Sequence, residues 1–385
     1  MPRKLTLTLA TALMMFPQIV ETIYSPALTD IARGLRISPA MVGQTLSVYF
    51  FAFAFGVVFW GRMCDVIGRR PAILAGLTLY TLASMMALFS HSFSLLLSAR
   101  VLAAFGVAVG SVGTQTAMRD SFSGHQLARI FSLMGMAMAI SPAIGVFSGA
   151  VLTYFWGYQG VFAALAWLAV ILWLYSFWQL PETRPRLRTT SSFWRVLVRM
   201  IRDADILRSA LLIALFNTTL FSYYQLAPFE FEQSAAGSHW FGYSGLILAA
   251  GTGIGAYINR YLLDQKWPFA ALLILSSLLA VTGGGLLWLL SGTLYFFLPM
   301  LLVVMAYGIA IPNLLARALR HYTDCMGSAG ALLGLLYYLL LGIGLAIAGG
   351  VQHLGVVLTI SGLLIALLSG MTIAAGRALP GRGIP

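Results

Sequence analysis

The chain has 385 residues, of which 60% are hydrophobic and only 9% are charged, and its mean hydropathy is +0.89. Soluble domains carry roughly 25% charged residues, so this composition excludes a soluble globular protein and indicates a polytopic membrane protein. The net charge of +12 does not indicate a nucleic-acid-binding protein, because the basic residues are spread over short turns and do not gather on one surface.

Twelve apolar stretches are long enough to cross a membrane, which takes about 20 residues of helix. The first follows a short basic segment, as in a signal peptide, but no small-residue cleavage site comes after it. We therefore expect it to remain as the first transmembrane helix. The predicted spans are approximately 5–28, 41–61, 72–90, 93–117, 128–152, 158–180, 208–232, 240–262, 268–290, 294–317, 327–350 and 353–376.

The basic residues predict how these spans are oriented. With the N-terminus inside the cell, the cytoplasmic segments hold all but three of the 23 Lys and Arg residues. Arg33 and Arg36 then lie outside, and Arg100 lies within a helix. Since positive charge is retained on the cytoplasmic side, this bias predicts an even number of spans with both termini cytoplasmic.

The longest hydrophilic stretch divides the predicted spans six and six. We expect an N-terminal bundle at 1–180, a cytoplasmic linker at 181–207 and a C-terminal bundle at 208–385. Within the linker, 192–206 is predicted either to form a helix on anionic headgroups or to stay solvated. Weak repeats between the halves, such as 61–65 against 255–259, predict two related bundles with a site between them.

Glu21 is the most costly residue to place in a bilayer, since a charged side chain there costs about 3 kcal/mol and normally faces a cavity or a partner. By helix rise, Glu21 lies roughly 9 Å from the outer end of the first span and Arg100 roughly 10 Å inside the fourth, so the two can meet at one level. Burial favours the protonated acid and a nearby arginine favours the carboxylate, so movement between these settings would load and release a proton. The alternative is a static ion pair.

Aromatic and polar residues in several spans indicate a substrate cavity. Such walls suit flat or amphipathic organic molecules, which they bind by stacking and a few hydrogen bonds. For any single residue, ordinary helix packing is the alternative. The predicted cavity residues are Tyr24, Tyr49, Phe53, Ser111, Gln115, Asn217, Tyr223 and Gln225.

A charged turn lies between the second and third spans. Its sequence is Gly61-Arg62-Met63-Cys64-Asp65-Val66-Ile67-Gly68-Arg69-Arg70-Pro71, and it resembles the loop 2–3 signature of the major facilitator superfamily. This resemblance implies the major facilitator fold, an all-α membrane protein with twelve transmembrane helices in two six-helix bundles. It also implies that Asp65 faces the start of helix 11, where the positive helix terminus would attract it. The predicted inner gate comprises Gly61, Asp65, Gly68, Arg69 and Arg70.

Three further stretches narrow the resemblance. The segment Ser141-Pro142-Ala143-Ile144-Gly145 is similar to the antiporter signature of helix 5, in which Pro142 permits a bend and Gly145 permits close packing. Leu180-Pro181-Glu182-Thr183 resembles the usual end of helix 6. The segment Ile23-Tyr24-Ser25-Pro26-Ala27-Leu28 resembles the bicyclomycin/chloramphenicol-resistance (Bcr/CflA) type of drug/proton antiporter. That group commonly has an acidic residue shortly before the tyrosine, which implies that Glu21 carries the proton.

We therefore expect a monomeric exporter of drug-like compounds in the bacterial inner membrane, driven by the proton gradient and using no cofactor. The alternatives are an exporter dedicated to one siderophore or metabolite and a proton-coupled uptake symporter. An enzyme or a metal site is not expected, because the five histidines lie in or near turns without ligand spacing. ATP is not the expected driver, since the chain has no Walker-type loop. Cys64 and Cys325 fall in predicted cytoplasmic turns, where a disulfide is not expected.

Overall fold

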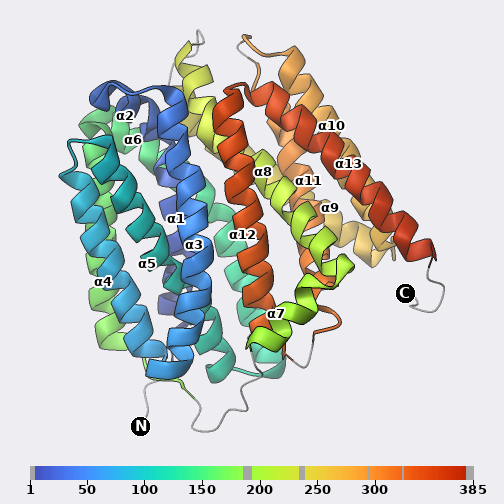
Figure 1. Ribbon diagram of the computed structural model, residues 1–385, viewed down its shortest axis with the longest axis horizontal. Coiled ribbons are helices and arrows are strands. Elements are labelled where there is room, and N and C mark those ends of the chain that lie inside the picture. The colour runs from blue at the N-terminus through green and yellow to red at the C-terminus, as the bar shows by residue number, and fades with distance from the viewer. Residues whose placement is uncertain (1–4, 185–192, 234–238, 294, 323–324, 379–385) are drawn as a thin grey trace.

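The computed structural model consists of helices and turns, with no strand in the residues that it describes. Those residues are 5–184, 193–233, 239–293, 295–322 and 325–378, with side chains excepted at 124, 125, 128, 129, 132, 136, 139, 193, 194, 239, 326, 327 and 375–378. Figure 1 shows the long helices running side by side along the height of the molecule. A helix satisfies all of its backbone polar groups internally, which is why an apolar chain adopts this architecture in lipid.

The predicted spans all correspond to helices. The helices are α1 (Leu7–Ile23), η1 (Ser25–Ala27), α2 (Leu28–Leu35), α3 (Pro39–Ile67), α4 (Arg69–Leu88), α5 (Phe93–Ser121), α6 (Gly124–Gln179), α7 (Phe193–Ile201), α8 (Ala204–Gln233), α9 (His239–Asp264), α10 (Phe269–Leu289), α11 (Met300–Leu319), α12 (Met326–Val351) and α13 (Leu354–Ala378). In the described part of the chain, eleven helical stretches are long and apolar enough to cross a membrane, and α1, η1 and α2 together form the first of them.

One of these stretches, in α6, contains two predicted spans. Its 47 residues from Leu133 to Gln179 would extend roughly 70 Å as a straight helix, against about 30 Å for the hydrocarbon core of a bilayer. The helix is broken at Gly157, which has a φ of 65° and a ψ of −170°. Asp30 holds this turn, because its Oδ2 accepts a 2.9 Å hydrogen bond from the Tyr158 backbone N–H. The two arms of α6 are thus the predicted spans 128–152 and 158–180.

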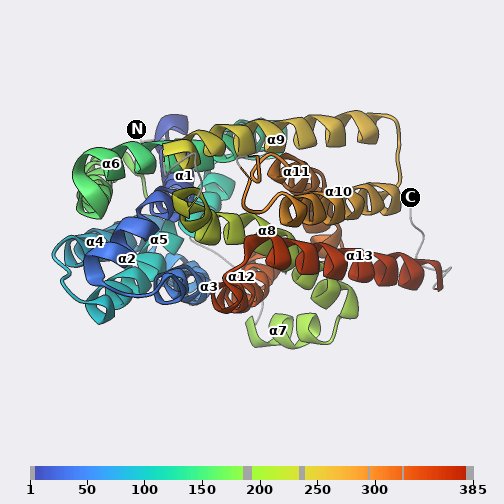
Figure 2. The ribbon, with the colours of Figure 1, turned by 90° about the horizontal axis from the view of Figure 1, so that it is seen from above.

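The helices of each half of the chain pack on one another. In the first half α5 contacts α3 and α4, and α1 contacts α6, while in the second half α10 contacts α11 and α13, and α9 contacts α11. Figure 2 shows the blue and cyan helices on one side and the orange and red helices on the other. Two extensive contacts cross between the halves, α3 with α12 and α6 with α9.

The charged turn is shorter than predicted. The sequence favours a loop over 61–71, but α3 continues to Ile67 and α4 begins at Arg69, so only Gly68 lies between them. Gly68 has a φ of 107°, a conformation that glycine adopts without the clash a Cβ atom would create. Asp65 is therefore on the last turn of one helix, and Arg69 and Arg70 are on the first turn of the next.

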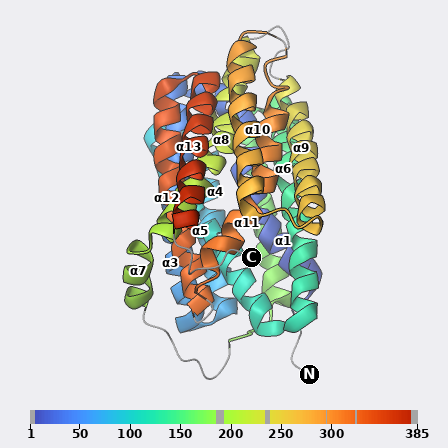
Figure 3. The same cartoon turned by 90° about the vertical axis from the view of Figure 1, so that its right-hand side faces the viewer.

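The linker helix α7 packs on the protein. Its Val196 and Met200 are buried in a cluster with residues of α8, α11 and α12. Arg199 stacks its guanidinium 4.4 Å from the Tyr322 ring centroid, and Tyr322 donates a 3.0 Å hydrogen bond to Asp203. Figure 3 shows α7 at the flank of the molecule beside α12. The helix predicted in 192–206 is confirmed over a shorter range, and one of its faces is covered by protein.

We predict that Gly157→Ala lowers the thermal stability of the protein. Alanine at this φ and ψ is strained by about 1–3 kcal/mol, and its Cβ would lie 3.0 Å from Asp30 Oδ2. The matched control is Gly135→Ala, because Gly135 is exposed on the same helix and a Cβ there meets nothing within 4 Å. Thermal unfolding in detergent, followed by tryptophan fluorescence, should give a lower melting temperature for Gly157→Ala only. Equal melting temperatures would contradict the prediction.

Candidate functional site

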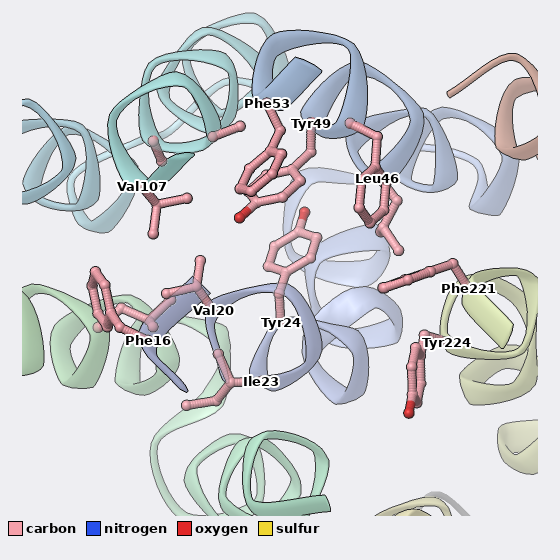
Figure 4. Packing of buried hydrophobic residues seen from close by; sticks show 14 of the residues in the cluster. Phe16, Val20, Ile23, Tyr24, Leu46, Tyr49, Phe53, Val107, Phe221 and Tyr224 are labelled. Atoms are coloured by element: carbon pink, nitrogen blue, oxygen red, sulfur yellow. The ribbon is translucent and has the colours of Figure 1, made fainter. Parts of the chain in front are cut away.

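Arg100 lies in α5 with its guanidinium between two tyrosine rings. Its Cζ is 4.0 Å from the ring centroid of Tyr24, the residue between α1 and η1. It is 4.4 Å from the ring centroid of Tyr49 on α3. Arg100 is only 2% exposed, and cation–π contacts of a desolvated arginine contribute about 2 kcal/mol, which offsets part of its lost hydration. Figure 4 shows the Tyr24 and Tyr49 side chains pointing toward each other, with Phe53 beside Tyr49.

Glu21 lies on α1 three residues before Tyr24 and is 4% exposed. Its Oε1 is buried without a hydrogen-bond partner, as is Nε of Arg100. Among the described residues, no ion pair within 4.0 Å joins Glu21 to Arg100. The two predicted proton-coupling residues thus share a buried region, but Arg100 stacks on tyrosines and does not pair directly with the acid.

The aromatic residues of α3 contact the second half of the chain. Phe50 lies 4.6 Å from Phe221 on α8, and Phe53 lies 4.8 Å from Tyr338 on α12, between ring centroids. The rings of Tyr49 and Phe53 are stacked at 6.2 Å. Phe221 and Tyr338 are not among the residues predicted from the sequence, although the pair Tyr337-Tyr338 in an otherwise aliphatic helix is a usable signal. These rings join α3, α8 and α12 in one cluster.

The remaining predicted cavity residues lie in separate places. Gln115 donates a 3.4 Å hydrogen bond to Ser111 along α5. Asn217 accepts a 3.3 Å hydrogen bond from Tyr307 of α11. Tyr223 donates a 2.7 Å hydrogen bond to Ser244 of α9. The structure therefore places Tyr24 and Tyr49 around Arg100, with Phe53 stacked on Tyr49, and leaves the role of the others as predictions.

A cavity of about 680 Å³ lies between η1, α2, α6 and α9. Its walls combine aromatic side chains with the charged Asp30 and Arg33. The lining residues are Pro26, Thr29, Asp30, Arg33, Phe147, Ala150, Val151, Thr153, Tyr154, Phe155, Gly242 and Tyr243. None of the predicted cavity residues is among them.

The segment around Gly145 packs closely on α1. A Cβ at Gly145 would lie 3.0 Å from the Ile19 carbonyl oxygen and would also overlap the Thr22 hydroxyl. The adjacent Val146 is fully buried and contacts Gly245 of α9. Pro142 lies within α6, and its predicted bend stays a prediction. This segment holds the helix that carries Glu21 against α6.

At the other end of the first half, Arg69 is the centre of an ionic cluster. Its side chain is fully buried. Its Nε donates to Asp120 of α5 at 2.7 Å, and its Nη1 donates to Asp65 at 2.9 Å and to the Cys64 carbonyl at 2.6 Å. The cluster ties α3, α4 and α5 together. Asp120 was missed from the sequence, although a charged residue directly after an apolar span is a signal for such a role.

Glu182, which follows α6, caps the start of α4. Its two carboxylate oxygens accept the backbone N–H groups of Arg69 and Arg70 at 3.0 and 3.1 Å. A carboxylate at a helix N-terminus satisfies free N–H groups and complements the helix dipole. A Cβ at Gly68 would collide with this carboxylate, whereas a Cβ at Gly61 would meet only Val112 at 3.5 Å, an ordinary contact. Gly68 thus has a steric reason to be glycine, and Gly61 has none at this distance.

The predicted contact of Asp65 is with the start of the eleventh span, which is α12. The side chains at 326 and 327 there lie outside the described residues, so this contact stays a prediction. The second half has an uncharged counterpart of the ionic cluster. Asn259, which aligns with Asp65 in the repeat, accepts a 2.6 Å hydrogen bond from Asn313 of α11. The corresponding ends of the two halves are therefore fastened by different chemistry.

Residues 7–345 match the family model described as Major Facilitator Superfamily. The chain belongs to this superfamily. Among relatives of this facilitator, an uncharacterized transporter of Rickettsia bellii is 31% identical over 346 residues, 84% of each chain. Multidrug resistance protein D of Escherichia coli is 26% identical over 379 residues, 91% of each chain. A chloramphenicol resistance protein of Pseudomonas aeruginosa is 27% identical over 329 residues, 83% of this chain and 77% of that one.

Solved structures agree with the facilitator fold. A D-xylose–proton symporter has a TM-score of 0.78 at 13% identity and covers 95% of this chain and 96% of its own. A bacterial homologue of the lysosomal transporter Spinster, in an inward-facing conformation, has a TM-score of 0.77 at 13% identity and covers 96% of both chains. The predicted Bcr/CflA-like type is confirmed by the resistance-protein relatives. This facilitator is a multi-pass transporter of the bacterial inner membrane, not an enzyme.

We predict that Arg69→Met strongly destabilises this facilitator. Removing one partner of a buried ion pair costs about 3–5 kcal/mol, because the other charge is left without compensation, and Asp120 is only 5% exposed. Arg62→Met is the matched control, since Arg62 is exposed near the end of the preceding helix, α3. Thermal unfolding in detergent should show a large loss for Arg69→Met and little for Arg62→Met. The double variant Arg69→Met/Asp120→Asn should recover part of the loss, and no recovery would argue against the pair.

Proposed function

We propose that this facilitator exports small, drug-like organic compounds across the inner membrane in exchange for protons. The observation that carries the proposal is the carboxyl of Glu21, buried without a partner for Oε1 beside the stacked Arg100. Ionisable residues inside transmembrane segments are costly and usually mark a substrate or proton pathway. The relatives named for multidrug and chloramphenicol resistance support organic compounds as the cargo.

The proposed architecture is two six-helix bundles, 1–180 and 208–385, joined by the linker at 181–207, with both termini in the cytoplasm. The packing of α1 to α6 with one another, and of α8 to α13 with one another, supports this division. The distribution of basic residues supports the orientation. We take the transporter to act as a monomer, with the proton gradient as its energy source and no cofactor.

In the proposed cycle Glu21 carries the proton. An ionised carboxylate that is buried without a hydrogen-bond donor costs several kcal/mol. Glu21 is therefore neutral in this conformation, in which its side chain is buried away from water. Rocking of the bundles admits water to the site, which stabilises the carboxylate, and the positive charge of Arg100 then favours release of the proton. Since Arg100 is stacked and not paired, no ion pair has to break before Glu21 is protonated again.

At the inner end, the proposed gate is Asp65 with Arg69 and Arg70. The ionic cluster around Arg69 and the Glu182 cap support this role, because they fix the end of α3 relative to α4, α5 and α6. Asp65 would then be held where it can meet the positive N-terminus of α12 when the inner side closes.

We predict that Glu21→Gln abolishes proton-coupled transport while the protein still folds. Glutamine keeps the volume of the side chain but cannot release a proton. The measurement is the loss of an acid-inside gradient, read with a pH-sensitive dye, when compounds are added to inverted vesicles. Asp264→Asn is the control, because Asp264 is exposed at the end of α9. If Glu21→Gln and wild type dissipate the gradient equally, Glu21 is structural and another carboxylate couples transport.

A second prediction concerns the cargo. Expression in a host without its own drug pumps should raise resistance to chloramphenicol or bicyclomycin several-fold, and Glu21→Gln should remove this protection. Protection against none of a broad drug panel would favour an exporter dedicated to one siderophore or metabolite. Alkalinisation of the medium when substrate is added to intact cells would indicate proton-coupled uptake and contradict export.

A further inference from the structure

We propose that Gln225 is the latch that holds the outer ends of the two halves together. It acts as a gating residue and not as a wall of the substrate cavity, which was its predicted role. This inference rests on the proposed alternating-access cycle, in which the outer ends must separate once per turnover. It follows from the position of one side-chain amide between three helices.

Gln225 joins backbone atoms from both halves of the chain. It lies on α8 and is fully buried. Its Nε2 donates one hydrogen bond of 3.0 Å to the Gly43 carbonyl oxygen on α3 and another of 3.1 Å to the Leu345 carbonyl oxygen on α12. Both acceptors are carbonyl oxygens, so only the NH₂ group can face them, and the orientation of the amide is fixed. One amide therefore holds α3, α8 and α12 in a single junction.

Glycines on either side make room for this amide. A Cβ at Gly43 would lie 2.9 Å from Nε2 of Gln225, and a Cβ at Gly349 would lie 2.8 Å from the same atom. Both distances are shorter than any relaxed contact of a real Cβ, so a larger residue at either position would displace the amide. Gly43 on α3 and Gly349 on α12 thus form a seat for the amide, with one helix from each half of the chain.

The other polar contacts that cross between the halves lie close to this junction. In the part of the chain that the structure describes, they are the hydrogen bond from the Ser25 hydroxyl to the Tyr224 carbonyl oxygen and the 3.3 Å ion pair of Arg33 with Glu232. The Arg33 and Glu232 side chains are 67% and 36% exposed, and exposed ion pairs contribute little. The exposed ion pair is thus the weaker restraint, and of the two buried contacts only the Gln225 amide also bonds a third helix, α12.

The latch is only partly satisfied, which suits a contact that must open. The Oε1 atom of Gln225 is buried and has no hydrogen-bond partner. Desolvation of this oxygen offsets part of the gain from the two donated hydrogen bonds. When the outer ends separate, water can reach both ends of the amide. The closed state is therefore held without being so stable that it traps the transporter.

The test measures the separation of the outer ends directly. Nitroxide labels are placed at exposed positions on either side of the junction, through Met41→Cys on α3 and Gln233→Cys on α8, after Cys64 and Cys325 are replaced by serine. Electron–electron resonance then gives the distance distribution in lipid nanodiscs without substrate. We expect Gln225→Leu to shift the ratio of closed to open outer ends toward open by about fivefold, as the loss of the one buried hydrogen bond that crosses between the halves, to the Gly43 carbonyl oxygen, predicts.

Gln44→Leu is the matched control. Gln44 is next to Gly43 on the same turn of α3, but its side chain is exposed, so the same change of amide to leucine should leave the distance distribution unchanged. A wild-type distribution for folded Gln225→Leu, with an unchanged melting temperature, would overturn the proposal.

A double-mutant comparison tests the seat independently. Gly43→Ala should open the outer ends in the wild-type background, because its Cβ displaces the amide. In a Gln225→Ala background, where that amide is absent, Gly43→Ala should have little further effect. Equal effects in both backgrounds would show that Gly43 acts through other neighbours and would contradict the latch.

These readouts separate the latch from the proposed function. The label distances do not depend on which compound is transported or on proton coupling. Distances that shift while wild type protects against no compound would support the latch and reject drug export. Distances that do not shift while wild type exports drugs would reject the latch and leave the proposed function in place.

Discussion

The structure depends on the rule that backbone polar groups in a bilayer must be satisfied within their own helices. Once that is achieved, lipid offers no hydrophobic force that pulls helices together, so specificity comes from close packing and from a few polar side chains. Three sites in this facilitator meet that need in different ways. Gly145 lets α6 approach α1, Arg69 binds three helices by charge, and the Gln225 amide joins three helices without charge.

The arrangement around Arg100 shows how a membrane protein can keep a charge without an ion pair. A buried arginine that pairs with a carboxylate fixes both groups, and breaking the pair is costly. Stacking between Tyr24 and Tyr49 instead spreads the interaction over two ring faces. In the proposed cycle, the positive charge then remains near Glu21 while the acid changes its protonation state.

Much of the fold follows from the sequence, because long apolar stretches and basic turns are strong signals. The approximate positions of the spans are predicted from these patterns, and each predicted span overlaps a helix. The single-residue connection at Gly68 is not, since charged residues suggest a loop even when they continue a helix. The division of α6 into two spans is predicted, because polar residues interrupt its apolar run near Gly157.

The details of the candidate site were less accessible. Patterns on one helix show which residues share a face, but not which helix that face meets. Asp120 and Glu182 act through partners on α4, and the role of Gln225 depends on the carbonyl oxygens of two distant helices. Backbone acceptors leave no trace in the amino-acid sequence. The sequence predicts that Arg100 and Glu21 can meet at one level, and only the arrangement of the helices shows that two tyrosine rings enclose Arg100.

The connection through Gly68 has a mechanical consequence. One residue between two helices of 29 and 20 residues leaves no slack, and the Glu182 carboxylate clamps the start of the second helix. A movement of the Asp65 end of α3 is therefore transmitted directly to α4 and to the end of α6, because no flexible loop lies between them. The connection at Gly68 is therefore rigid, and a small displacement of Asp65 would tilt α3, α4 and the end of α6 together.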